Sequence, residues 1–133
     1  MELQALKRYL LAKPETTEEI PFGPEALVFK VLGKMFALVA WDETPVRISL
    51  KCDPERALEL RAVFKGVRGA YHFNKRHWNM VDLDGSIPEP EVLAMIDDSY
   101  DLVVRRLPKA KRERINRELP QFRNICRSPV VDG

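Results

Sequence analysis

The sequence lacks any apolar run of the roughly 20 residues that a membrane-spanning helix needs, and its first residues, MELQALKRYLLAKPE, are too polar for a secretory signal. We therefore expect no membrane segment. It has only two cysteines, Cys52 and Cys126, which are too far apart to indicate a disulfide framework or a zinc knuckle. A reduced, cytoplasmic setting is expected.

Signatures of catalysis and of cofactor binding are also missing. The chain has no Walker lysine loop, no GxGxxG and no HExxH, and its two histidines, His72 and His77, lack a neighbouring cysteine or carboxylate at a known ligand spacing. Ser99 has no glycine elbow around it, so it is expected to be a packing or hydrogen-bonding residue of a helix. The sequence predicts no catalytic residue, no metal and no cofactor.

A group of three aspartates, Asp97, Asp98 and Asp101, could in principle bind a hard cation or supply acid and base groups. A solvated polar face of a helix is the simpler explanation, and we expect that.

What is present is an ordinary globular composition in 133 residues, with 45% hydrophobic and 32% charged residues. One hydrophobic core serves a chain of this length. The net charge of +2 is unevenly distributed, because residues 105–133 hold nine Lys or Arg against three Asp or Glu. We expect an α+β domain over residues 1–109 and a basic C-terminal extension over residues 110–133 that packs on it or trails from it.

Periodicity and turn residues predict the element order α-β-β-β-α-β-β-α plus a basic C-terminal helix, as a single domain with an antiparallel sheet packed against helices. An ordered loop is expected between the first helix and the first strand. The expected helices cover residues 2–12, 54–64, 86–107 and 109–119, and the expected strands cover residues 27–32, 35–41, 46–51, 70–73 and 78–83.

A cluster of basic and aromatic residues surrounds the second predicted hairpin. Cations attract phosphates and exposed rings can stack on bases, so such a hairpin is a candidate for binding nucleic acid. A second basic turn, at Gly33-Lys34, lies in the first hairpin. The candidate nucleic-acid-binding residues are Lys34, Lys65, Arg68, Lys75, Arg76, His77 and Trp78.

Four stretches, taken together and in this order, resemble the MmcQ/YjbR family: PFGPEALVFKVLGKMFAL, ISLKCDPERALELR, GAYHFNKRHWNMVDLDGSIP and IDDSYDLVVRRLPK. The resemblance implies a YjbR-like α+β fold and DNA binding through a "double wing" of hairpins. It carries over the hairpin residues Tyr71, His72, Asn74, Lys75, His77 and Trp78. Family members commonly have Pro-Gly before the tyrosine, where this chain has Gly69-Ala70. Residues 111–133 lie beyond the resemblance.

Our first hypothesis is a cytoplasmic protein that binds DNA or RNA through its basic hairpins. The alternative is an interaction or adaptor module, in which the same sheet and Trp78 bind a protein partner. An enzyme of unrecognised type comes third.

Overall fold

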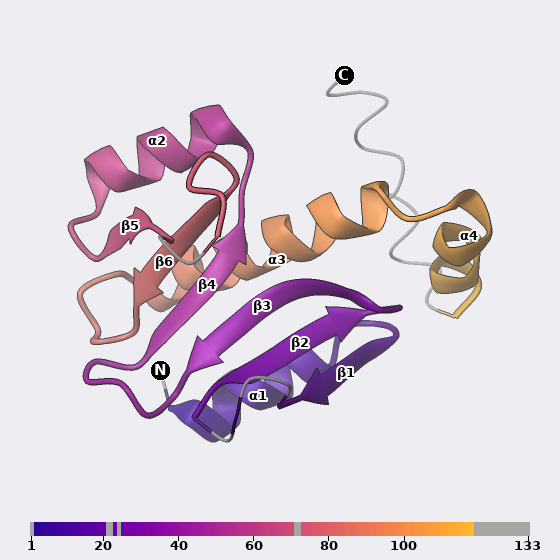
Figure 1. Ribbon diagram of the computed structural model, residues 1–133, viewed down its shortest axis with the longest axis horizontal. Helices are drawn as coiled ribbons and strands as arrows, with labels where there is room; N and C mark the ends of the chain where they lie inside the picture. The colour runs from indigo at the N-terminus through magenta and orange to yellow at the C-terminus, as the bar shows by residue number, and fades with distance from the viewer. Residues whose placement is uncertain (1, 21–22, 24, 71–72, 119–133) are drawn as a thin grey trace.

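The computed structural model describes residues 2–20, 23, 25–70 and 73–118, and shows one six-stranded antiparallel sheet with helices packed on one of its faces (Figure 1). The strand order is β1-β2-β3-β4-β6-β5. The α+β class and the antiparallel sheet predicted from the sequence are confirmed. The elements in chain order are α1 (Leu3–Leu11), β1 (Thr16–Glu19), β2 (Leu27–Val31), β3 (Lys34–Ala40), β4 (Arg47–Lys51), α2 (Pro54–Val63), β5 (Val67–Gly69), β6 (Trp78–Asp82), α3 (Glu89–Arg105) and α4 (Lys109–Glu118).

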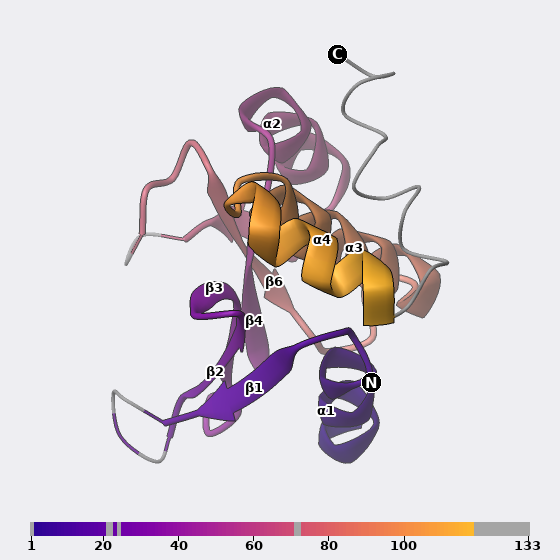
Figure 2. The same cartoon turned by 90° about the vertical axis from the view of Figure 1, so that its right-hand side faces the viewer.

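The core lies between the sheet and helices α1, α2 and α3. The three- and four-residue spacing of Val92, Ile96, Ser99 and Val103 predicts the buried stripe of α3, and all four are buried, as is Leu107 just after the helix. It packs against β3 and β4, the two central strands. Figure 2 shows the sheet nearly edge-on, with α1 and α3 together on one side.

The opposite face of the sheet carries no described helix. Its central row follows from the strand register: Val28 pairs with Leu38, Leu38 with Ser49, Ser49 with Met80, and Met80 with Arg68. Residues paired across an antiparallel ladder point to the same side. We call this side the open face.

Strand β1 was not predicted, because its sequence, Thr-Thr-Glu-Glu, lacks alternating apolar residues and was interpreted as a loop. It forms the edge of the sheet, and its acidic residues are paired on both sides of it. Glu18 lies 3.3 Å from Lys7 of α1, and Glu19 lies 3.1 Å from Lys30 of β2. An edge strand held by ion pairs has no hydrophobic alternation to detect.

The fifth strand lies earlier than predicted, at Val67–Gly69 in place of residues 70–73. Val67 is buried opposite Val81, which anchors the strand to β6. Ala70 and Phe73 are outside any strand, and residues 71 and 72 lie outside the described residues.

Smaller differences concern single residues. The alternation of Ser49 with Ile48 and Leu50 predicts that Ser49 faces water, but it is buried on the open face because Leu38 and Met80 flank it. The first hairpin turns at Leu32 and Gly33, both with positive φ, rather than at Gly33-Lys34. The sequence predicts Ser86 or a neighbour as the N-cap of α3, and Pro88 takes that position. It also predicts Asp53 as the N-cap of α2, which the structure shows, but without a side-chain hydrogen bond.

Helix α4 packs against the rest of the protein through Ile115, which is fully buried. Two of its cations have partners: Arg114 lies 3.0 Å from Glu15, and Lys111 donates to the carbonyl of Leu32 at 3.4 Å. Among the residues that the structure describes, no helix has both the length and the apolar character needed to cross a bilayer.

Candidate nucleic-acid interface

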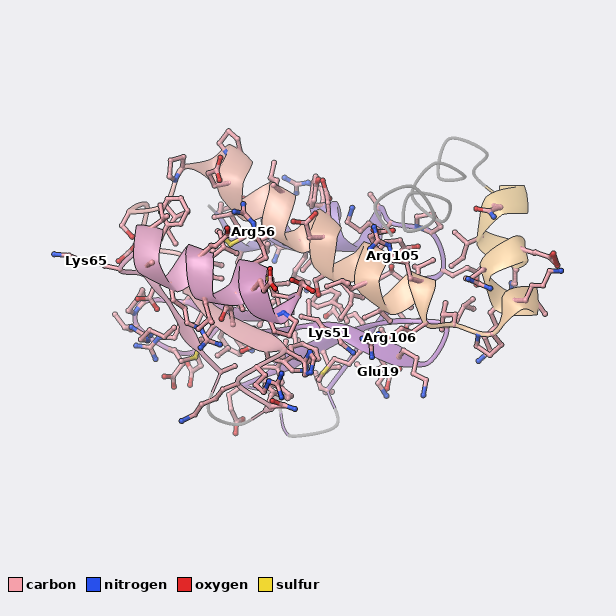
Figure 3. All side chains as sticks on the ribbon, turned by 90° about the horizontal axis from the view of Figure 1, so that it is seen from above. Glu19, Lys51, Arg56, Lys65, Arg105 and Arg106 are labelled. Carbon is pink, nitrogen blue, oxygen red and sulfur yellow. The ribbon has the colours of Figure 1, made fainter. Side chains whose placement is uncertain are left out.

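Three cations from three different elements meet around one depression, at the end of the sheet where β4 finishes and β3 begins. The depression measures about 240 Å³ and is lined by Lys34, Met35, Lys51, Val103 and Arg106. We call Lys34, Lys51 and Arg106 the cation triad. Figure 3 shows Lys51 and Arg106 close together near the middle of the molecule.

Local structure explains why these side chains converge. Lys34 begins β3, directly after the tight turn of the first hairpin, where it pairs with Val31. Lys51 ends β4, and Arg106 is the C-cap of α3. A cation at a helix C-terminus is favourably placed against the negative end of the helix dipole.

The electrostatics of the depression are strongly positive. Burial, followed by the charges of Arg106 and then Lys34, lowers the pKa of Lys51 below its ordinary value. No carboxylate belongs to the lining among the described residues. The site therefore holds unneutralised positive charge, which favours an anion.

An aromatic pair lies beside the triad. Lys51 is directly opposite Trp78 in the β4–β6 register, so both side chains point to the open face. The ring of Phe73 stacks on that of Trp78, with centroids 4.7 Å apart and planes 23° apart. A cation and an aromatic surface thus lie side by side on the same side of the sheet.

The loop between β5 and β6 supplies two more cations. Lys75 and Arg76 are exposed on this loop, which projects away from the helices to the open-face side (Figure 2). Arg61 of α2 holds the loop, because its guanidinium donates to the side-chain oxygen of Asn79 at 2.7 Å and to the carbonyl of Lys75. Together with Pro54, Glu55 and Leu58, these three cations line a second depression of about 320 Å³.

The remaining candidate residues are placed differently. Arg68 lies on the open face, but its guanidinium is 3.0 Å from Asp82, which Arg47 also contacts at 3.1 Å. Lys65 points away from the molecule at its far end, remote from Lys51 (Figure 3). His77 is half-buried, and its backbone is bonded to Asn74 and Cys52. The predicted set is therefore divided between the loop, the triad and two outlying positions.

Lys51 and Arg106 were missed in the sequence because 55 positions separate them. A signal did exist for each. The alternation of Ile48 and Leu50 places Lys51 on the face opposite to theirs. Arg106 follows Ser99 by seven residues, or two helical turns, on the same stripe of α3.

The aspartates of α3 do not form one site. Asp97 accepts hydrogen bonds from Tyr9 and Lys13 of the N-terminal segment, and Asp101 pairs with Arg105. Asp98 lines a separate internal space beside Cys52, where burial raises its pKa. Within the described ranges, no three His, Cys, Asp or Glu side chains are grouped so that they could hold a metal ion. Tyr71 and His72 lie outside those ranges.

Comparisons with known proteins add a family and a fold. A family model described as YjbR matches residues 11–102. The "Uncharacterized protein YjbR" of Escherichia coli K12 is 37% identical over 113 residues, which cover 85% of this chain and 96% of that protein. "Uncharacterized protein YbdF" of E. coli O157:H7 is 36% identical over 112 residues, covering 84% and 92%.

Solved structures agree with the fold. The crystal structure of the Deinococcus radiodurans protein DR2400 matches with a TM-score of 0.80 and 38% identity, over 86% of this chain and 87% of that one. A Pseudomonas syringae protein matches with a TM-score of 0.67 and 31% identity, over 77% and 98%.

Proposed function

The chain belongs to the YjbR family, and we propose that it binds single-stranded nucleic acid on the open face of its sheet. One observation carries the proposal: the cation triad and the Phe73–Trp78 stack adjoin each other through the pairing of Lys51 with Trp78. Phosphates need cations and unpaired bases need aromatic surfaces, and here the two lie at neighbouring positions.

The architecture favours a single strand over a duplex. Proteins that read single strands commonly use an exposed sheet whose aromatic residues stack on splayed bases. Duplex readers more often insert a basic helix into the major groove. Here α3 is half buried and carries the paired Asp97 and Asp101, while α4 has its Lys111 and Arg114 engaged with the protein itself.

The loop cations extend the proposed path. The loop that carries Lys75 and Arg76 projects on the open-face side (Figure 2), so a strand whose phosphate lies at Lys51 could continue over Trp78 toward the loop and the depression that both cations line beside α2. In this proposal the two hairpins flank the bound strand as wings. The protein binds the strand and catalyses no reaction on it. It does so in the cytoplasm, where a free thiol such as that of Cys52 stays reduced.

The test compares two variants that lose the same charge. Lys34→Ala/Lys51→Ala/Arg106→Ala removes the triad, and Arg8→Ala/Arg56→Ala/Lys65→Ala removes three exposed cations elsewhere. We expect the triad variant to bind a labelled 12-nucleotide DNA or RNA strand at least tenfold more weakly in fluorescence anisotropy, with the control variant within twofold of the native protein.

Two results would overturn the proposal. Equal weakening in both variants would mean that only the overall charge matters, and a duplex bound more tightly than either strand would contradict the single-strand mode.

Trp78→Ala should also weaken binding by about tenfold, because stacking contributes roughly 1–3 kcal/mol per base.

A protein-binding role is the second candidate, and a different surface favours it. Helix α2 exposes Leu58 and Val63 to 63% and 70%, and exposed apolar groups of this kind are typical of interaction sites. In that case Leu58→Glu should abolish capture of a partner, while the triad variant captures it normally.

A further inference from the structure

The cation triad surrounds a depression at one end of the sheet and not a groove that runs along the sheet. Its depression is bounded on the helix side by Val103 and Arg106 of α3, and at the sheet by Met35 of β3 and Lys51 of β4. A strand that crosses the open face reaches the depression at Lys51, and Val103 and Arg106 line the depression on its other side. The three cations therefore surround one position at the end of the sheet.

A buried hydroxyl of α3 bridges the backbones of β3 and β4 beside the depression. Ser99 donates to the carbonyl of Phe36 at 2.6 Å and accepts from the N–H of Lys51 at 2.8 Å. This arrangement replaces a direct β3–β4 bond at the position where their ladder ends, after Ala37 and Leu50. It also fixes the distance between β4 and α3, and hence between Lys51 and Arg106.

The charge at the site exceeds what one internal phosphate would neutralise. A phosphodiester within a strand carries one negative charge, whereas a terminal phosphomonoester carries close to two at neutral pH. Burial, followed by the charges of Arg106 and Lys34, lowers the pKa of Lys51, and a second negative charge on the ligand offsets this effect more fully than one. A monoester also offers three oxygens free of ester bonds, one for each cation of the triad.

The neighbouring ring suits the same ligand. The base attached to a terminal phosphate must lie close to it, and Trp78 occupies the position directly opposite Lys51. A terminal nucleotide can thus place its phosphate in the depression and its base against the Phe73–Trp78 stack.

On these grounds we infer that the Lys34–Lys51–Arg106 depression holds the terminal phosphomonoester of a nucleic-acid strand. This inference rests on the proposed function. It adds that the protein distinguishes a phosphorylated end from a hydroxyl end.

The experiment uses the full-length protein and three labelled 12-nucleotide strands of one sequence, with a 5′-phosphate, a 3′-phosphate or neither. We expect one phosphorylated strand to bind about tenfold more tightly than the unphosphorylated strand. Lys51→Gln and Arg106→Gln should each remove that preference. Lys75→Gln, a loop variant with the same loss of charge, should weaken all three strands equally and retain it.

The outcomes separate the inference from the function on which it rests. If all three strands bind with equal affinity and Lys51→Gln weakens them all alike, the open face binds nucleic acid and the end-site inference is overturned. If no strand binds at low salt, the proposed function falls, and the inference falls with it.

A direct readout at the site accompanies these measurements. NMR of the Lys51 side chain should give a pKa below the ordinary lysine value of 10.5, rising when the phosphorylated strand is added. A Lys51 pKa that stays constant on saturation with that strand would place its phosphate elsewhere and overturn the inference.

Discussion

At the scale of single residues, Ser99 shows how one side chain determines local geometry. The sequence correctly placed it in the buried stripe of α3, because neighbours at helical spacing are apolar. Its partners could not be predicted, since Phe36 and Lys51 lie 63 and 48 positions away along the chain. Such distant contacts depend on how the sheet and helix are packed, which local spacing does not encode.

We predict that Ser99→Ala destabilises the protein by roughly 2–3 kcal/mol, because it leaves a backbone carbonyl and a backbone N–H without their partner in the core. The free energy of unfolding in urea measures the effect. Ser86→Ala, at an exposed turn, is the matched control and should change it by under about 0.5 kcal/mol. A loss of similar size in both variants would show that the hydroxyl bridge is not important for stability.

At the scale of elements, α1 and α3 are joined by a buried cation. Lys13, whose side chain is only 10% exposed, lies 2.6 Å from Asp97 and within 5.0 and 5.4 Å of the ring centroids of Tyr9 and Tyr100. The hydroxyl of Tyr9 donates to the same carboxylate at 2.7 Å, and the hydroxyl of Tyr100 donates to the carbonyl of Pro14 at 2.6 Å. This network attaches the N-terminal helix to α3.

We predict that Asp97→Asn destabilises the protein by about 1–2 kcal/mol, a moderate amount because Asp97 is itself 47% exposed. The cause is that Lys13 keeps its charge in a largely buried position without its counter-ion. The double variant Lys13→Met/Asp97→Asn should be more stable than Asp97→Asn alone in thermal unfolding. Glu59→Gln, on the exposed side of α2, serves as the control. If the double variant is less stable than Asp97→Asn, the ammonium of Lys13 is stabilised mainly by the rings of Tyr9 and Tyr100.

The sequence predicted most of the elements, and it failed where tertiary contacts replace periodicity. The helices have apolar residues at three- and four-residue spacing and are bounded by prolines, so they could be located. Strand β1 is held by ion pairs from Lys7 and Lys30, which leave no local pattern. The candidate site was found only in part, because the hairpin loop has a local basic signature whereas the cation triad forms from three distant segments.

At the scale of the whole molecule, the two sides of the sheet have separate roles. One side packs against helices and accounts for the core. The other carries Leu38, Ser49, Met80 and Trp78 together with cations at its margins. The net charge of +2 does not reveal this division, because it adds together the charges on both sides of the sheet.

We predict a salt dependence for a strand with a terminal phosphate that reflects four neutralised phosphate charges, two at the triad and one each at Lys75 and Arg76. For a single strand this gives a slope of about −2.8 in log affinity against log salt, or roughly a fiftyfold weakening from 50 to 200 mM. The triad variant should reduce the slope to about −1.4. Anisotropy titrations at four salt concentrations measure it. A slope near zero in the native protein would mean that phosphates are not the ligand.

The edge strands described above have a consequence for how the protein behaves at high concentration. The sheet ends at one side with four residues, two of them glutamates in ion pairs, and at the other with three residues. Short, charged edges resist the addition of a further strand, whether from a second copy or from an unfolded neighbour. The sheet face on which no described helix packs therefore does not make the sheet a template for aggregation, and the ligand that we propose would approach across that face rather than extend the sheet.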